Sequence, residues 1–190
     1  MPLRLCIDPG HGYSNAEPGR YDTGAVAGGV EEADLVLMWA RTGEWVLGQP
    51  PFSISTWLTR THDSPAPLST RNEQAEMRGC THLISLHCNS STGTTASGTE
   101  TFHRDASDRL LAEIVQRAAL EALTLRDRGL KLEQNAAQGR LAILDFNGPA
   151  CLLELGFITN PTDRSRMLER DRRIAFWQRV GEGILRVYEL

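Results

Sequence analysis

The sequence predicts a single α/β domain with a three-layer arrangement, in which a mostly parallel six-stranded sheet carries helices on both faces. Short strand-like runs alternate with segments of helical periodicity along the whole chain. A length of 190 residues suits one domain with a substantial core and is too short for two ordinary domains. Hydrophobic residues make up 41% of the chain and charged residues 23%, as in soluble globular proteins. We therefore expect one domain over residues 1–190.

Six segments are expected to form strands because they are short and are either apolar or alternate between apolar and polar residues. They cover residues 5–7, 52–59, 82–88, 99–103, 141–144 and 150–155.

Five segments show apolar residues at helical spacing. They cover residues 31–47, 68–78, 107–125, 161–169 and 170–190, with Phe176 expected at the margin of the last apolar face. Residues 13–29 and 126–139 are rich in glycine and polar side chains, and we expect them to be loops.

Composition excludes several classes of function. The formal net charge is −4, which gives no reason to expect a nucleic-acid partner, and no apolar run approaches the roughly 20 residues that cross a bilayer. The chain passes from residues 1–4 directly into a strand, without the basic and apolar regions of a signal peptide. We expect a monomer that is made in the cytoplasm, or a leaderless form of a secreted protein. The four cysteines show no CxxC spacing and are expected to be buried, reduced thiols.

Two histidines stand where predicted strands end. His11 lies in the corner Pro-Gly-His-Gly after the first strand, and His87 lies at the end of the strand at residues 82–88. Open α/β sheets keep their sites at this edge, so the two imidazoles can meet at one metal ion if their strands are neighbours. A zinc site then needs carboxylates, for which Glu31, Glu32 and Glu154 are candidates. Taken singly, each histidine also fits an ordinary hydrogen-bonded loop or core residue.

Glu154 is the one charged residue in an otherwise apolar predicted strand. An unpaired buried carboxylate costs several kcal/mol, so this side chain must either be hydrogen-bonded or take part in the protein's chemistry. It is either a hydrogen-bonded carboxylate at a strand end or a general base beside a metal-bound water.

The remaining histidines are weaker candidates. Strand alternation points His82 to the sheet face opposite His87. His62 and His103 are expected in loops or on the surface.

Five motifs, in order along nearly the whole chain, are shared with a known family. They are residues 7–12 (Ile-Asp-Pro-Gly-His-Gly), residues 29–37 (Gly-x-x-Glu-x-Asp-x-x-Leu), the set Thr59, Arg60, Asp63, Leu68 and Arg71, residues 85–90 (Ser-Leu-His-Cys-Asn-Ser), and residues 154–160 (Glu-Leu-Gly-Phe-x-x-Asn). On these motifs the chain resembles the zinc-dependent N-acetylmuramoyl-L-alanine amidases of the third amidase family.

This resemblance implies a site and a reaction. It makes His11, one glutamate of the pair at 31 and 32, and His87 the ligands of one Zn²⁺ per chain, and it makes Glu154 the catalytic residue. The family's spacing favours Glu32, which precedes an aspartate by two residues and a leucine by five. Asp8 and Asn89 are candidates for orienting the ligands.

The resemblance also implies a biological role. The substrate is peptidoglycan, cut between muramic acid and the L-alanine of the stem peptide, as by a phage endolysin or a bacterial autolysin. Regulated relatives carry a helical insertion that blocks the zinc, and residues 90–107 are too few to hold one. We therefore expect activity without an activating partner.

Three other functions stay open. A zinc peptidase could cut within the stem peptide, and a non-catalytic wall-binding module could share the fold. A cysteine hydrolase could pair Cys88 with His87, although adjacent residues on a strand point to opposite faces.

Overall fold

The computed structural model describes residues 3–13, 20–61 and 67–188. Its main sheet has six strands. In spatial order they are β4 (Ser55–Leu58), β1 (Arg4–Pro9), β5 (His82–Asn89), β8 (Ala150–Phe157), β6 (Thr99–His103) and β7 (Asp127–Leu132). The first four are parallel, β6 runs antiparallel to β8, and β7 is parallel to β6. The mostly parallel six-stranded sheet is thus confirmed.

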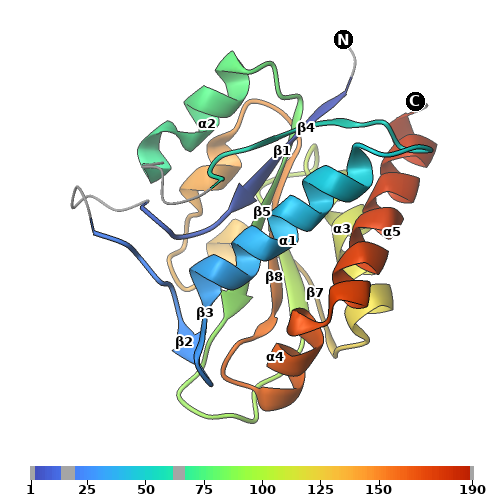
Figure 1. Cartoon of the computed structure of the whole chain (residues 1–190). Coiled ribbons are helices and arrows are strands. Elements are labelled where there is room, and N and C mark those ends of the chain that lie inside the picture. The colour runs from blue at the N-terminus through green and yellow to red at the C-terminus, as the bar shows by residue number, and fades with distance from the viewer. Residues whose placement is uncertain (1–2, 14–19, 62–66, 189–190) are drawn as a thin grey trace.

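Helices cover both faces of this sheet, which confirms the three layers (Figure 1). One face carries α1 (Glu32–Leu47), α3 (Arg109–Leu123) and α5 (Arg170–Tyr188). The other carries α2 (Leu68–Met77) and the 3₁₀ helix η2 (Ala142–Asp145). The helix α4 (Pro161–Leu168) follows β8, the 3₁₀ helix η1 (Glu133–Asn135) follows β7, and β2 (Val26–Ala27) pairs with β3 (Val30–Glu31). No described helix is long and apolar enough to cross a bilayer.

Two segment predictions for the main sheet were wrong, and the loop expected over residues 13–29 also contains the two-residue strand β2. Residues 141–144, expected to be a strand, form most of η2, and residues 127–132, expected to be loop, form the edge strand β7. A short apolar run can be buried in either conformation, and here Ile143 and Leu144 pack on the sheet as part of the smaller core. None of the six residues of this edge strand is fully buried, so its polar sequence carries no strand signal.

Packing of α1 against α5 relies on one glycine. Trp177 donates a hydrogen bond from Nε1 to the carbonyl oxygen of Trp39 at 2.8 Å. The indole lies directly against Gly43, where a Cβ atom would be 2.4 Å from the Trp177 ring. Phe176, expected at the margin of the helix face, is fully buried because its ring packs edge-on against Trp39 and Trp177. These aromatic rings join the two long helices of the larger core.

A buried ion pair lies beneath the end of β1. The carboxylate of Asp8 accepts hydrogen bonds from Thr59 Oγ1 at 2.5 Å, from Ser85 Oγ at 2.6 Å and from Arg71 Nη1 at 2.7 Å. Asp8 and Arg71 are each about 1% exposed. Burial alone would raise the pKa of Asp8, but Arg71 and the two hydroxyl groups hold it below its ordinary value. The ion pair therefore links β1, β4, β5 and α2 behind the corner that carries His11.

Two arginines hold this corner through its backbone. Arg71 donates to the carbonyl oxygens of Pro9 and His11, and Arg60 donates to those of Pro9, Gly10 and Ala33. Guanidinium groups suit this task because their donors are fixed in one plane. The corner has a defined shape even though its residues form no regular element.

The contact at Gly43 predicts that Gly43→Ala destabilises the protein. Alanine would gain about 1 kcal/mol in helix propensity. Overpacking of a filled core typically costs about 1–3 kcal/mol, and the indole has no space to move because its Nε1 is held. We expect a net loss of about 1 kcal/mol in the free energy of unfolding by urea denaturation. The neighbouring exposed change Glu44→Ala should stay within about 0.5 kcal/mol of wild type, and a stabilised Gly43→Ala protein would contradict the packing argument.

The ion pair predicts that Asp8→Asn lowers the free energy of unfolding by about 3–5 kcal/mol at pH 7, because Arg71 is left buried without its counter-charge. The matched control Glu113→Gln breaks an exposed pair with Arg109 and should cost less than about 0.5 kcal/mol.

The contribution of Asp8 to the free energy of unfolding also depends on pH. Because the folded-state pKa of Asp8 lies below its ordinary value of 3.8, the stabilisation is present above about pH 4 and is lost as the pH falls further. The difference between wild type and Asp8→Asn should therefore narrow below pH 4, and a difference that stays constant would contradict this origin.

Candidate active site

The corner after β1 brings His11 beside His87. His11 adopts a φ of 61°, and Gly12 follows at 78°. The amide of Gly10 donates to the carbonyl oxygen of Leu86 at 3.0 Å, which continues the pairing of β1 with β5. A Cβ atom at Gly10 would lie 2.2 Å from the His87 ring, so only glycine lets the corner pass the imidazole. The two rings lie with their centroids 4.9 Å apart.

Glu32, the first residue of α1, lies between these two rings. Its Oε1 atom is 3.0 Å from His11 Nε2 and 3.2 Å from His87 Nδ1, and it accepts a hydrogen bond from the amide of Cys88 at 2.8 Å. Its Oε2 atom accepts from the amide of Ala25 at 3.0 Å. The structure thus brings together three of the residues singled out in the sequence, with one ligand atom from each lying within 4.8 Å of the others.

The acid and the histidines in this cluster shift one another's pKa values in opposite directions. Burial would raise the pKa of Glu32, but the two histidines lower it far below its ordinary value. Burial would lower the pKa of His11, but hydrogen bonds and charges from Glu32 and Asp22 raise it to about 9. Each of these shifts reflects several donors and acceptors converging in a small volume.

The donor set fits a divalent cation such as zinc. Two imidazole nitrogens and one carboxylate oxygen form a common catalytic zinc set, which leaves one position open. Ligand atoms about 2.1 Å from a tetrahedral ion are about 3.4 Å from each other, close to the 3.0 and 3.2 Å found here. Glu31 precedes the helix as its N-cap and is not part of the cluster, although the sequence left it as an alternative.

Asp22 orients His11 and was missed in the sequence. Its Oδ2 atom is 3.0 Å from His11 Nδ1, and its Oδ1 atom accepts from the amide of Gly24 at 3.0 Å. This contact directs Nε2 of the same ring toward Glu32, as carboxylates do behind metal-binding histidines. The sequence signal was weak, because an aspartate in a glycine-rich loop is ordinary.

The residues expected to orient the ligands have other partners. Asp8 binds Arg71 and two hydroxyl groups, as described above, and Asn89 donates to Glu100 at 2.8 Å. Neither makes a hydrogen bond to the His11 or His87 ring within the described residues.

Glu154 lies directly opposite His87 in the pairing of β5 with β8, so both side chains project from the same sheet face. The residue keeps some solvent exposure, but its Oε2 atom is buried and has no hydrogen-bond partner in the described part of the chain. Burial raises the pKa of Glu154 to about 7, and the charges of Glu32 and Glu100 add to this rise while His87 opposes it. A carboxyl group whose pKa lies near the working pH can both accept and donate a proton.

The other candidates lie apart from this cluster. His82 packs against Tyr188 at the far end of β5, on the face opposite His87, as alternation predicts. His103 is buried in β6, and the expectation of a surface position was wrong because the segment is a central strand rather than an edge. His62 lies outside the described residues.

All four cysteines are free and buried, as expected. The Sγ atom of Cys88 lies 3.8 Å from Met167 Sδ within the larger core, away from the His87 ring. Burial raises the pKa of the Cys88 thiol well above its ordinary value, which disfavours the thiolate. This arrangement does not support a cysteine nucleophile.

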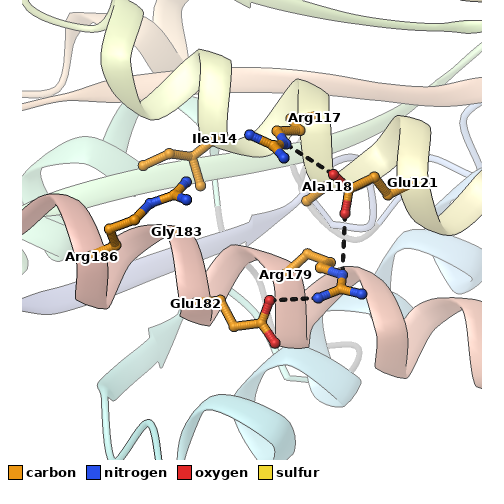
Figure 2. A pocket seen from close by; sticks show the side chains of 8 residues that line it. All are labelled: Ile114, Arg117, Ala118, Glu121, Arg179, Glu182, Gly183 and Arg186. Carbon is orange, nitrogen blue, oxygen red and sulfur yellow. Dashed lines mark hydrogen bonds and ion pairs between the residues drawn. The ribbon is translucent and has the colours of Figure 1, made fainter.

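A separate groove of about 350 Å³ lies between α3 and α5 (Figure 2). Figure 2 shows Glu121 and Glu182 both paired with Arg179 along this groove. None of the residues predicted to form the site lines it.

Comparison with known proteins matches nearly the whole chain to one family. The family model described as N-acetylmuramoyl-L-alanine amidase (Amidase_3) matches residues 5–186. The N-acetylmuramoyl-L-alanine amidase CwlM of Bacillus licheniformis is 30% identical over 184 residues, which cover 95% of this chain and 65% of that protein. The amidase LytC of Bacillus subtilis is 27% identical over 192 residues, covering 97% of this chain and 35% of that protein. The chain thus spans about two thirds of one relative and one third of the other.

Solved structures agree over nearly the full chain. The catalytic domain of CwlV, an amidase from Bacillus (Paenibacillus) polymyxa var. colistinus, superposes with a TM-score of 0.84 at 27% identity and covers 98% of each chain. An N-acetylmuramoyl-L-alanine amidase from Clostridium difficile 630 gives 0.83 at 29% identity, covering 99% of this chain and 97% of that one. The chain therefore belongs to the Amidase_3 family of N-acetylmuramoyl-L-alanine amidases.

Proposed function

We propose that residues 1–190 form the catalytic domain of a zinc-dependent N-acetylmuramoyl-L-alanine amidase. The reaction is hydrolysis of the amide bond between the lactyl group of N-acetylmuramic acid and the L-alanine of the peptidoglycan stem peptide. One observation carries the proposal: in a member of this family, three metal-ligand atoms converge opposite a carboxylate oxygen that has no hydrogen-bond partner in the described part of the chain.

Three side chains would hold the metal. His11 offers Nε2, Glu32 offers Oε1 and His87 offers Nδ1, and Asp22 fixes the ring of His11 from behind. When bound, Zn²⁺ supplies a Lewis acid that lowers the pKa of water from about 16 toward 7 and polarises the lactyl carbonyl group. The chain contributes these ligands, and Glu154 projects from the same sheet face as His87.

Glu154 moves the proton. Its Oε2 atom takes the proton of the attacking water as the carbon–oxygen bond forms. The same carboxyl group then gives this proton to the alanine nitrogen as the carbon–nitrogen bond breaks. Oε2 has no hydrogen-bond partner in the described part of the chain, and this supports the role because a fully hydrogen-bonded carboxylate would exchange protons less readily.

The proposed role in the cell is lysis of the wall, as by an endolysin or an autolysin, acting as a monomer on peptidoglycan. Between β5 and α3 the described residues form only β6 and turns, so that segment holds no helix that could cover the site. We therefore propose that the purified chain cleaves bare sacculi without a protein partner.

Removing the carboxylate of Glu154 should stop turnover and spare the metal. We expect Glu154→Gln to lower kcat by about 100- to 10,000-fold, because the isosteric amide cannot accept the proton. The readouts are mass spectrometry of released peptides with a free N-terminal L-alanine and elemental analysis of bound zinc. The control Glu31→Gln makes the same charge change beside Glu32 and should keep the wild-type rate.

Three results would contradict the assignment. A near-normal rate in Glu154→Gln would remove Glu154 from catalysis. Peptides cut at an internal bond would indicate a stem-peptide peptidase instead, and wall binding without release of any peptide would indicate a binding module.

Activity should depend on zinc and not on thiols. We expect dialysis against a chelator to abolish peptide release and added Zn²⁺ to restore it. Iodoacetamide should have no effect, because the four cysteines are buried. His87→Ala should lose the bound zinc, whereas His103→Gln, which alters a histidine outside the cluster, should retain it. Inhibition by iodoacetamide together with resistance to the chelator would favour a cysteine mechanism.

A further inference from the structure

A row of ionisable side chains continues from the candidate site across the sheet. Glu154 on β8 pairs with His87 on one side and with Glu100 of β6 on the other. Directly opposed residues project from the same face of a sheet. The next strand in the row is β7, which carries Arg128 and Lys131. The row therefore leads from the metal-ligand cluster to two cations.

A bulge in β7 turns both cations toward this row. Thr99 pairs with Asp127 and Thr101 with Leu130, so two residues of β7 oppose the single residue Glu100. Gly129 occupies the bulge with a φ of 82°. In a regular strand Arg128 and Lys131, three residues apart, would point to opposite faces. Here both reach the same oxygen of Glu100.

Charge in this group is not balanced. Oε2 of Glu100 accepts from Arg128 Nε at 2.7 Å and from Lys131 Nζ at 2.6 Å, while Oε1 accepts from Asn89 at 2.8 Å. One buried carboxylate neutralises one of the two cations. A structural ion pair would need only one. Within the described residues Glu154 forms no ion pair with Arg128 or Lys131, so the second positive charge has no carboxylate of its own.

The guanidinium of Arg128 is held in place through its Nε atom, while its two terminal nitrogens make no hydrogen bond within the described residues. It lies over the Phe157 ring at 5.0 Å, and its stem passes Gly98, where a Cβ atom would be 2.9 Å from Arg128 Cγ. Its Nη1 and Nη2 atoms make no hydrogen bond to any described residue. The side chains of Arg128 and Lys131 are each 29% exposed. A fixed pair of free guanidinium nitrogens is suited to bidentate binding of a carboxylate.

The spacing relates this cation to the peptide side of the substrate. Glu154 and β7 are separated by two strand intervals, or about 10 Å. Two extended peptide residues span about 7 Å, and the arginine side chain covers the remainder. A carboxylate on the residue after L-alanine would therefore reach Arg128 while the scissile amide lies at Glu154.

We propose that Arg128 and Lys131 form the subsite that binds the free α-carboxylate of the second stem-peptide residue, a γ-linked glutamate, and that they disfavour its amidated form. This inference rests on the proposed amidase function. It assigns to the chain a specificity for the charge state of the wall peptide.

Binding of the product peptide tests the subsite separately from catalysis. The probes are L-Ala-γ-D-Glu-L-Lys-amide and the same peptide with the glutamate α-carboxylate amidated, titrated into the intact chain by calorimetry. We expect the free acid to bind at least about tenfold tighter. Arg128→Gln should reduce this ratio to about one, and the neighbouring exposed change Arg126→Gln should preserve it.

Lys131→Met is the second variant if Arg128→Gln fails to fold, as judged by urea denaturation, and it should also reduce the ratio. Equal binding of the two peptides to wild type, no measurable binding of either, or an unchanged ratio in the folded variants would overturn the subsite.

Hydrolysis of the two corresponding N-acetylmuramoyl tripeptides separates this inference from the amidase proposal. We expect wild-type kcat/KM to favour the free acid about tenfold, and Arg128→Gln to raise KM for that substrate. Cleavage of both substrates at equal kcat/KM, with equal product affinity, would overturn the subsite and leave the amidase function standing. A chain that cleaves neither substrate but prefers the free-acid peptide would refute the amidase function and support the subsite.

Discussion

The buried ion pair of Asp8 and Arg71 is the constraint on which the site depends. Burying two charges costs several kcal/mol unless every polar atom is satisfied, and the hydroxyl groups of Thr59 and Ser85 complete the shell of the carboxylate. Arg71 also donates hydrogen bonds to the carbonyl oxygens of Pro9 and His11 in the corner. His11 is thus positioned by long-range contacts from β4, β5 and α2, which explains how a loop residue with a positive φ can occupy a defined place.

The two glutamates near the histidines differ because their surroundings differ. Glu32 has three nitrogen atoms within 3.2 Å of one oxygen and a strongly lowered pKa, which suits a permanent negative ligand. Glu154 has an unbonded buried oxygen and a pKa raised to about 7, which suits proton transfer. Carboxyl groups with pKa values driven apart in this way are a recurring basis for dividing roles within one site.

Much of the fold could be predicted because its elements bury apolar side chains with a regular period. The strands 82–88 and 150–155 and the five helices follow from that period with small changes at their ends. The errors concern segments where the period is absent: β7 is an edge strand with polar residues, and the apolar run at 141–144 is too short to distinguish a strand from a 3₁₀ helix. Neighbouring elements decide such cases.

The sequence by itself determined the fold class, the two histidines at strand ends and the isolated glutamate in an apolar strand, because residue type and local period carry that information. Only the tertiary structure decided that Glu32 and not Glu31 faces the histidines, that Asp22 lies behind His11, and that a bulge turns Arg128 and Lys131 toward Glu100. The physical reason is that hydrogen bonds and charge pairs depend on distance in space. They join residues far apart in the chain, 77 positions between Asp8 and Ser85 and 138 between Trp39 and Trp177, and no local pattern records them.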